Sequence, residues 1–261
     1  MNDSNRPTAL ITGASSGIGA ALARELARHG HDLVLTARSV APMEGLADEL
    51  RKLGAAATVI PADLAAPGAA AALVEQIAGA GLAVEVLVNN AGLGALGRFE
   101  RIGVGRNADI MQVNIVALTE LTYRLLPGML SRQRGLIVLV ASTASFLPCP
   151  NMAVYGASKA YVRSLGEALA QELRGTGVGV NVLCPGATAT NFFAVAGHLR
   201  SALQARRMMS AEAVARIGYA GMQRGRRVTV TGLMNRVLAF AATHVPHFLT
   251  LPAAQRMMAQ D

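Results

Sequence analysis

The sequence contains no tryptophan, only two cysteines and very little lysine. Cys149 and Cys184 give no metal-binding spacing and no disulfide framework, so we expect no metal site and a reducing, cytoplasmic compartment. We expect Cys149 to be a packed thiol rather than a nucleophile. Of the 24 basic residues only Lys52 and Lys159 are lysines. A chain that otherwise uses arginine has at Lys159 the compact, titratable ammonium that catalysis can use.

Targeting and membrane-spanning patterns are also missing. Residues 1–5 are polar, and glycine and serine interrupt the apolar run that follows, so we expect no secretion signal. The most membrane-like segment, Val237 to Leu251, is shorter than the ~20 residues that a spanning helix needs. His244, Pro246 and His247 interrupt it as well. The sequence therefore predicts no transmembrane helix.

The chain is rich in apolar segments, which recur at regular intervals. Hydrophobic residues make up 52% of its 261 residues, which is too apolar and too periodic for a disordered protein. This length fits one large domain with a substantial core. The sequence has no visible repeat, linker or boundary, so we expect residues 1–261 to form a single domain.

The N-terminal part has the order strand, glycine turn, helix. Thr8–Thr12 is a short apolar run that suits a buried strand, and Gly13–Gly19 follows at once, before a helical pattern. Glycines permit a tight turn and close backbone approach, and the N–H groups at a helix N-terminus can bind a pyrophosphate. This order is the context that a dinucleotide-binding fingerprint requires.

Apolar segments alternate with helical patterns along the rest of the chain. The further predicted strands are Asp32–Ala37, Thr58–Pro61, Val84–Asn89, Leu136–Val140, Val178–Leu183 and Arg227–Thr231, and predicted helices include Met43–Leu53, Arg106–Leu126 and a run from Tyr155 to Arg174. Almost continuously apolar strands between helices favour an α/β fold with a parallel, doubly wound sheet and helices on both faces. Ligands are expected at the carboxyl ends of such strands.

Two residues predict the type of dinucleotide. The second strand ends at Ala37, where NAD-binding proteins have an acidic residue, and Arg38 follows. A carboxylate would repel a 2′-phosphate, whereas a guanidinium pairs with one. We therefore expect NADP(H) rather than NAD(H), with an ordinary surface charge as the alternative reading of Arg38. Asp63, directly after the third strand, could accept a hydrogen bond from an adenine amino group.

Tyr155 and Lys159 form the only Tyr-x-x-x-Lys of the chain, and residues four apart on a helix share one face. A tyrosine with a pKa near ~10 is a poor acid–base at neutral pH, and a cation within about 4–6 Å lowers that pKa. Lys159 and a positively charged nicotinamide ring together could bring the pKa of Tyr155 close to neutrality. The alternative is an ordinary pair on a helix surface, so the prediction depends on the other motifs.

Those motifs occur in one order along the chain: Thr12–Gly19, Asn89–Gly92, Asn114, Ser142, Tyr155, Lys159 and residues 185–190. Over about residues 7–192 the chain thereby resembles the short-chain dehydrogenase/reductase family. The resemblance implies a Rossmann-like sheet of about seven strands. It implies that Tyr155 is the general acid–base and that Lys159 lowers its pKa and holds the nicotinamide ribose. It also implies that Ser142 hydrogen-bonds the substrate oxygen and that Asn114 supports a water-linked proton relay.

The resemblance and the strand ends together predict the cofactor site. The residues expected there are Gly13, Ser15, Ser16, Gly17, Ile18, Gly19, Arg38, Asp63, Leu64, Asn90, Ala91, Gly92, Tyr155, Lys159, Pro185, Gly186, Thr188 and Thr190. Asn114 on its own could equally be a core residue that the backbone satisfies.

The chain departs from the family pattern at two places. Ser16 stands where NADP-using members often have a basic residue in the glycine turn, so Arg38 alone carries the predicted preference. After Gly232 the chain continues into an amphipathic extension over about residues 233–261. Residues 192–212 are expected to form a substrate lid, whose apolar side chains, Phe192 among them, could line a pocket or form a helix core.

Positive charge gathers near the C-terminus. Nine arginines, against Glu212 and Asp261, carry +7 of the formal +8: Arg200, Arg206, Arg207, Arg216, Arg224, Arg226, Arg227, Arg236 and Arg256. Such a region can attract phosphates, anionic lipids or an acidic partner, and it can equally be a solvated face. Because it lacks interleaved aromatics and a recognition motif, we expect no nucleic-acid binding.

These observations predict an NADP(H)-dependent oxidoreductase that transfers a hydride between the nicotinamide and a carbonyl or secondary alcohol. A mainly apolar small-molecule substrate and a cytoplasmic location are expected, and the family resemblance implies a homo-oligomer, a dimer or a tetramer. Peripheral membrane contact through the basic C-terminal region is left open. The alternative is a non-catalytic NADP-binding scaffold or sensor that uses this region to meet a membrane surface or an acidic partner.

Overall fold

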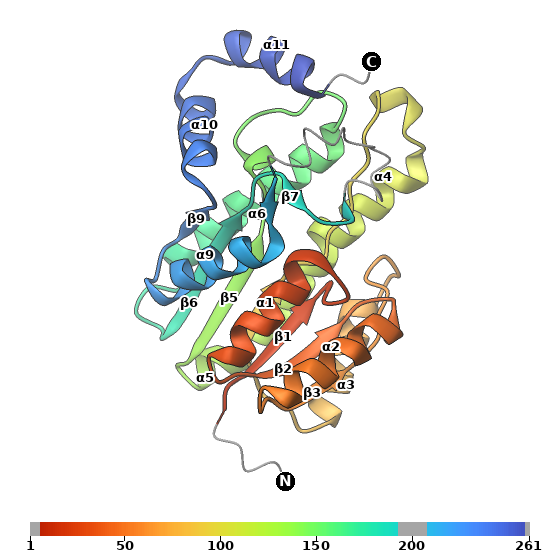
Figure 1. Cartoon of the computed structure of the whole chain (residues 1–261), viewed down its shortest axis with the longest axis vertical. Coiled ribbons are helices and arrows are strands. Elements are labelled where there is room, and N and C mark those ends of the chain that lie inside the picture. The colour runs from red at the N-terminus through yellow and green to blue at the C-terminus, as the bar shows by residue number, and fades with distance from the viewer. Residues whose placement is uncertain (1–5, 193–207, 259–261) are drawn as a thin grey trace.

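A computed structural model describes residues 6–192 and 208–258, and a seven-stranded parallel sheet forms its centre (Figure 1). The strands lie in the order β3-β2-β1-β4-β5-β6-β9, and every neighbouring pair is parallel. Their bounds are β1 Thr8–Thr12, β2 Asp32–Thr36, β3 Ala57–Val59, β4 Val84–Asn89, β5 Gly135–Val140, β6 Val178–Cys184 and β9 Val228–Val230. The α/β fold and the doubly wound sheet expected from the sequence are confirmed.

The strand order reverses next to β1. From β1 the chain adds β2 and β3 on one side, and it then returns to place β4, β5 and β6 on the other. Ile11 pairs with Val88, and Val88 pairs with Val138, so the carboxyl ends of β1, β4 and β5 lie side by side. In sheets of this type the ligand binds at such a switch point.

Helices cover both faces of the sheet (Figure 1). The helices packed on one face are α1 (Gly17–Arg28), α2 (Val40–Lys52) and α9 (Ala211–Gln223), and those on the other are α3 (Ala69–Gly79), α5 (Leu118–Ser131) and α6 (Ala153–Glu172). Ile11 and Leu35 point into the first layer, and Leu10 and Val34 point into the second. Because both faces of these strands are buried, their sequences are apolar without alternation.

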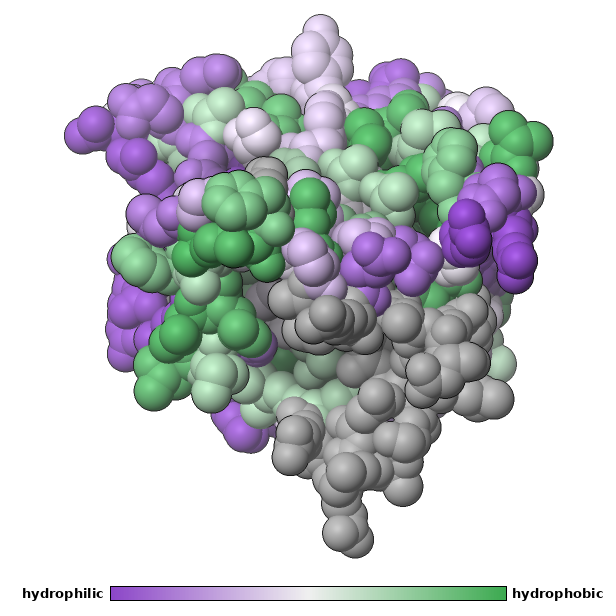
Figure 2. Space-filling view, turned by 90° about the horizontal axis from the view of Figure 1, so that it is seen from above, coloured by the Kyte–Doolittle hydropathy of each residue, from purple (hydrophilic) through white to green (hydrophobic). Residues whose placement is uncertain are grey.

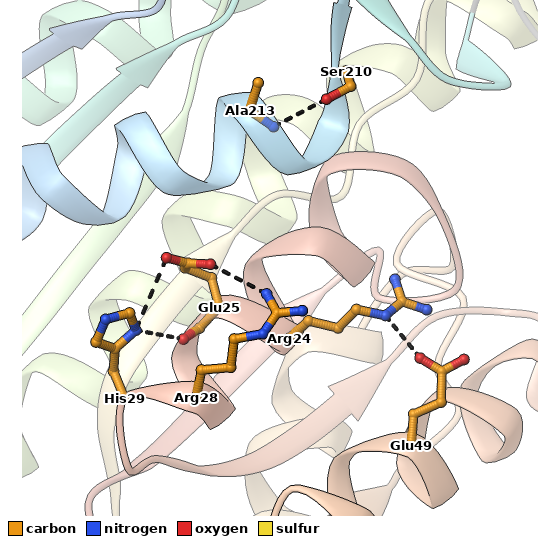
Figure 3. A network of polar contacts seen from close by, with 7 residues as sticks. All are labelled: Arg24, Glu25, Arg28, His29, Glu49, Ser210 and Ala213. Carbon is orange, nitrogen blue, oxygen red and sulfur yellow. Dashed lines mark hydrogen bonds and ion pairs between the residues drawn. The ribbon is translucent and has the colours of Figure 1, made fainter.

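Polar contacts connect the helices of the α1 layer (Figure 3). Arg24 of α1 donates a 2.8 Å hydrogen bond to Glu49 of α2, and the Ser210 hydroxyl caps the first turn of α9. His29 stacks on Tyr219 of α9 with the ring centroids 4.0 Å apart. These contacts hold the scaffold on which the carboxyl ends of the strands are arranged.

The helical segment after β4 is less regular than the predicted helix over residues 106–126. After a 3₁₀ turn, η1 (Phe99–Arg101), it consists of α4 (Val104–Met111), a π-helical turn η2 (Gln112–Ala117) and α5 in direct succession. Single π-helical turns inside a longer helix often occur at functional sites, and this one contains Asn114. Apolar periodicity in the sequence gives no sign of it.

Most of the elements that the sequence did not predict lie at the carboxyl edge of the sheet. A short strand pair joins β7 (Thr188–Ala189) to β8 (Met209–Ser210), and η3 (Thr143–Ser145) follows β5. Residues 193–207 of the predicted lid lie outside the described residues, and residues 209–212 belong to β8 and the start of α9. The predicted extension consists of two helices, α10 (Leu233–His244) and α11 (His247–Met258), as far as the structure describes it (Figure 1).

None of the helices within residues 6–192 and 208–258 combines the length and the apolarity that crossing a membrane requires.

Candidate active site

The turn between β1 and α1 leaves a space that no side chain fills. Gly13 (φ 66°) and Gly17 (φ 57°) adopt the left-handed conformation, which favours glycine. A Cβ atom at Gly19 would overlap the Gly13 carbonyl oxygen, so only glycine lets α1 pack this closely on the turn. In the described structure the α1 N-terminus has no side-chain cap and no acidic residue in its first turn. Its free N–H groups therefore suit an anionic pyrophosphate.

A set of hydrogen bonds joins the ends of β1 and β4. The Thr12 hydroxyl accepts from the backbone N–H groups of Asn90 and Ala91, at 3.0 and 2.9 Å. The Asn90 side chain donates in return to the carbonyl oxygens of Thr12 and Gly13, at 2.9 and 3.2 Å. These bonds hold the glycine turn and the segment after β4 at a fixed separation across the switch point.

Arg38 and Asp63 follow β2 and β3, and both line the cleft that begins at the glycine turn. The Arg38 side chain is exposed there. Asp63 Oδ1 accepts a 3.1 Å hydrogen bond from the backbone of Ala65, which fixes the carboxylate beside Leu64 at the cleft wall.

Tyr155 and Lys159 lie one turn apart on α6 and reach the same cleft. Lys159 Nζ donates a 2.8 Å hydrogen bond to the carbonyl oxygen of Val140 and lies 5.9 Å from the centroid of the Tyr155 ring. Ser142, two residues after β5, accepts a 3.1 Å hydrogen bond from the backbone of Ala144, and its side chain hydrogen-bonds Tyr155. The structure thus brings together three of the four side chains predicted to be catalytic.

Burial is the main influence on the pKa values of this pair. Burial raises the pKa of Tyr155 to about 12, with the Ser142 hydrogen bond opposing the shift, and burial lowers the pKa of Lys159 to about 8. The expected lowering of the Tyr155 pKa by Lys159 and a nicotinamide ring together stays a prediction for the protein with its cofactor bound. The loss of water around the phenol dominates, and the ammonium is directed at Val140 rather than at the phenol oxygen. Tyr155 is therefore held in its proton-donating form at neutral pH.

Asn114 lies behind the cleft wall and is completely buried. Its Oδ1 accepts from the backbone N–H of Leu93 at 2.8 Å, and its Nδ2 donates to the Leu93 carbonyl oxygen at 3.0 Å and to Ser158 Oγ at 2.9 Å. Ser158 donates in turn to the Tyr155 carbonyl oxygen at 2.7 Å. Asn114 thereby connects the segment after β4 with the first turn of α6, and the water-linked relay expected for it stays a prediction.

The segment after β6 forms a further wall of the cleft and meets the glycine turn at Thr190. The lining residues from this segment are Pro185, Gly186, Thr188 and Thr190. Thr190 packs closely on Gly17, because a Cβ atom added to Gly17 would lie 2.9 Å from the Thr190 methyl carbon. Sequence reasoning missed Asn235 of α10, which packs its side-chain amide against Gly186 and donates a hydrogen bond to Thr231. A single asparagine near a helix start gives no signal that would have identified it.

All of these parts surround one cleft of about 740 Å³. Every predicted cofactor residue lines the cleft except Gly19, which packs beneath the turn, and Asn114 is the only predicted catalytic residue that does not reach it. The sequence did not predict that α10 and α11 complete the wall. The wall residues from these helices and the connection between them are Asn235, Leu238, Ala239, Ala241, Ala242, Val245, Leu249, Thr250 and Ala254. An amphipathic pattern predicts that one face of a helix is buried, but it does not identify what that face covers.

An aromatic ring and a thiol lie near the phenol of Tyr155. The Phe192 ring lies 5.3 Å from the Tyr155 ring, centroid to centroid. The buried Cys149 thiol lines the cleft, and burial raises its pKa to about 11, which fits a packed thiol rather than a nucleophile. Among the described residues, no three His, Cys, Asp or Glu side chains are grouped so that they could hold a metal ion.

Several known proteins are similar to this chain in sequence and in fold. The family model for short chain dehydrogenases matches residues 7–199. Oxidoreductase UcpA of Escherichia coli K12 is 37% identical over 181 residues, which cover 69% of this chain and 68% of UcpA. Ketoacyl reductase HetN of Nostoc is 37% identical over 179 residues, 69% of this chain, and the match spans only 62% of HetN's length.

Solved structures extend the likeness over nearly the whole chain. A short-chain dehydrogenase from Sphingobium yanoikuyae in complex with NADPH has a TM-score of 0.80 at 32% identity, covering 97% of this chain and 94% of that one. A bulky-bulky ketone specific alcohol dehydrogenase from Comamonas testosteroni has a TM-score of 0.77 at 31% identity, covering 97% and 93%. A family member from Burkholderia phymatum in complex with NAD has a TM-score of 0.81 at 28% identity, covering 92% and 94%. The chain belongs to the short-chain dehydrogenase/reductase family.

Proposed function

We propose that the protein is an NADP(H)-dependent oxidoreductase that interconverts a carbonyl and a secondary alcohol of a mainly apolar substrate, with Tyr155 as the general acid–base. The observation that carries the proposal is the convergence of Tyr155, Ser142 and Lys159 on a cleft that begins at a glycine turn. Membership of the family supports an oxidoreductase with a nicotinamide cofactor.

The residues at the glycine turn fit a dinucleotide. Cβ atoms at Gly13, Gly17 and Gly19 would overlap neighbouring protein atoms, so the glycines allow the close packing that shapes the turn. The uncapped α1 N-terminus offers N–H groups to a pyrophosphate. Arg38 would pair with a 2′-phosphate, and Asp63 would receive the adenine amino group. When bound, the nicotinamide supplies or accepts the hydride.

The two hydroxyl groups would hold the substrate oxygen. Ser142 and Tyr155 interact with each other, and each hydroxyl has one proton, so a substrate oxygen that replaces this contact would accept from both. Preorganised donors at an oxygen that gains negative charge are usually the largest contribution to such a step. Tyr155, kept protonated by burial, would then give its proton to the alkoxide, which is the direction that carbonyl reduction needs.

Lys159 would hold the cofactor in position rather than transfer a proton to the substrate itself. The hydrogen bond from Lys159 Nζ to the Val140 carbonyl oxygen fixes the ammonium at the wall of the cleft. Its other N–H groups would donate to the ribose hydroxyls of the cofactor. A Cβ atom on Gly92 would lie 3.3 Å from Lys159 Nζ and 3.4 Å from Asn114 Oδ1, so glycine at this position keeps the space between them open. That space is where a proton relay through Asn114 would run.

The walls of the cleft favour an apolar substrate of some size. Leu238, Val245 and Leu249 from α10 and α11 line the same cleft as Leu147 and Phe192, whose ring lies beside Tyr155. The Comamonas protein, which is named for its specificity for bulky ketones, is similar to this chain along its length. We infer a ketone or aldehyde with a bulky apolar part as the substrate.

A non-catalytic NADP-binding scaffold is the second candidate. The convergence of Ser142, Tyr155 and Lys159 argues against it, because cofactor binding alone does not require a buried phenol with a hydroxyl partner. A homo-oligomer remains an inference from the family resemblance, and a cytoplasmic location remains an inference from the cysteine content.

Oxidation of NADPH and of NADH, followed against ketones and aldehydes of graded size, tests the proposal. We expect NADPH to be oxidised with bulky apolar ketones, and NADH to be used poorly. Cofactor binding without turnover of any substrate in the series would favour the scaffold instead.

A further inference from the structure

The outward side of the C-terminal helix pair is apolar. Leu233, Val237 and Phe240 follow one another at helical spacing on α10, with Met234 beside them, and Phe248 continues the surface on α11. All five are exposed, Phe240 to 65% and Phe248 to 74%. We call these five residues the C-terminal apolar face. Figure 2, which looks down on this end of the molecule, shows apolar side chains gathered on its surface.

The opposite side of α10 packs on the domain. Ala239 and Ala242 are buried there, and Asn235 rests against Gly186. The packing of α10 therefore fixes which side of the helix is exposed. A rotation of α10 about its axis would remove Ala239, Ala242 and Asn235 from the cleft wall.

The C-terminal apolar face continues into the cleft. Leu238 and Leu249 line the cleft, yet both are more than half exposed, at 51% and 58%. An apolar molecule that lies against the face would thus reach the cleft without crossing a polar rim at this point.

The C-terminal end of α10 offers few free polar groups to a specific protein partner. Thr243 Oγ1 donates to the Ala239 carbonyl oxygen, and His244 Nδ1 is paired with the Phe240 carbonyl oxygen, so these two polar side chains are turned onto their own helix. Arg236 is the exposed charge of α10. Specific protein interfaces carry about one hydrogen bond per 100–200 Å², whereas a lipid surface needs none.

The charge at this end of the chain has one sign. No aspartate or glutamate occurs between Glu212 and Asp261, while that stretch contains six arginines. They do not form one surface, however. Arg224, Arg226 and Arg227 precede β9 and α10 follows it, so these three lie at the opposite end of the strand. Arg200, Arg206, Arg207 and the side chain of Arg256 are not described, so among the described side chains Arg236 supplies the positive charge at the face.

We propose that the C-terminal apolar face docks the protein on the surface of a membrane that contains anionic lipids. Phe240, Phe248 and their neighbours enter the boundary between headgroups and acyl chains, and Arg236 meets the headgroups. The mouth of the cleft at Leu238 and Leu249 then faces the lipid surface, so an apolar substrate can pass from the membrane to Tyr155. Lipid binding itself does not depend on turnover and stands apart from the proposed function.

Co-sedimentation of the full chain with vesicles tests this docking. The vesicles contain either phosphatidylcholine alone or phosphatidylcholine mixed with phosphatidylglycerol. We expect binding to the mixed vesicles that weakens as salt is added, because exposed charges are screened. The double variant Phe240→Ser/Phe248→Ser should bind at least about tenfold more weakly, since two large apolar side chains no longer leave water.

Phe99→Ser is the matched control, because Phe99 on η1 is also 65% exposed and lies on neither α10 nor α11. It should bind vesicles as the unchanged protein does, and all three proteins should melt alike and reduce a water-soluble ketone alike. Equal binding by the double variant and the unchanged protein would overturn the proposal. The proposal would also fail if the unchanged protein does not bind vesicles and the double substitution changes its oligomeric state. The face would then contact a second copy of the chain.

Discussion

The carbonyl oxygen of Val140 accepts a 2.8 Å hydrogen bond from the ammonium of Lys159. The end of β5, and not the phenol of Tyr155, therefore fixes the position of the only lysine in the cleft. The lysine is buried, and its pKa is lowered to about 8 as a result. A charge kept in a place that disfavours charge is typical of a functional site.

Replacing that charge should separate function from stability. We expect Lys159→Met, which keeps the apolar stem, to lower kcat/KM by about 100-fold or more. The melting temperature should change little, because the substitution also removes a buried charge. Kinetics and thermal unfolding of the same preparation check this. Turnover close to that of the unchanged protein would remove Lys159 from the mechanism.

The two directions of the reaction should depend differently on pH. Reduction needs the phenol, and a pKa of about 12 keeps Tyr155 protonated throughout the neutral range. Oxidation needs the phenolate, whose fraction rises about tenfold per pH unit below the pKa. We expect kcat/KM for reduction to be flat until the ammonium of Lys159 deprotonates near pH 8, and kcat/KM for oxidation to rise below that pH. A reduction rate that falls steadily through neutral pH would instead mean that the phenol already loses its proton there.

Arg38 should decide between the two cofactors. Arg38→Asp is expected to weaken NADPH binding by at least about tenfold and to improve the use of NADH, because a carboxylate repels the 2′-phosphate that a guanidinium pairs with. Binding titrations with both cofactors measure the change. Arg174→Asp is the control, since Arg174 is exposed just after α6 and does not line the cleft. An identical response of the two variants would assign the effect to net charge alone.

The glycine turn should tolerate no side chain at Gly19. A Cβ atom there overlaps the Gly13 carbonyl oxygen, so we expect Gly19→Ala to cost about 1–3 kcal/mol of unfolding free energy and to impair cofactor binding. Gly45 is exposed within α2, and a Cβ atom added to it would meet no other atom within 4 Å, so Gly45→Ala should instead stabilise by about 0.5–1 kcal/mol. Denaturant unfolding compares the two. A Gly19→Ala protein as stable as Gly45→Ala would show that the turn can open.

The sheet could be predicted from the sequence because its strands are buried on both faces. The predicted strand Val84–Asn89 has the bounds that the structure shows, since a polar Asn-Asn-Ala-Gly stretch ends an apolar run there. The same reasoning places Ser142 at the carboxyl edge, because residues that follow parallel strands meet there.

Burial and long-range packing could not be predicted in this way. The sign of the Tyr155 pKa shift depends on how much water the fold removes, which no spacing of residues reveals. The role of Asn114 as a connection between Leu93 and Ser158 depends on a π-helical turn. Asn235 lies about fifty residues along the chain from Gly186, against which it packs.

The most direct test of the account is the Tyr155→Phe variant, measured for NADPH turnover and for NADPH binding in parallel. Phenylalanine keeps the ring that packs beside Phe192 and removes only the hydroxyl that hydrogen-bonds Ser142. The account predicts that kcat/KM falls by at least about 100-fold while the affinity for NADPH stays within about threefold. Turnover that survives the substitution would contradict the assignment of Tyr155 as the general acid–base.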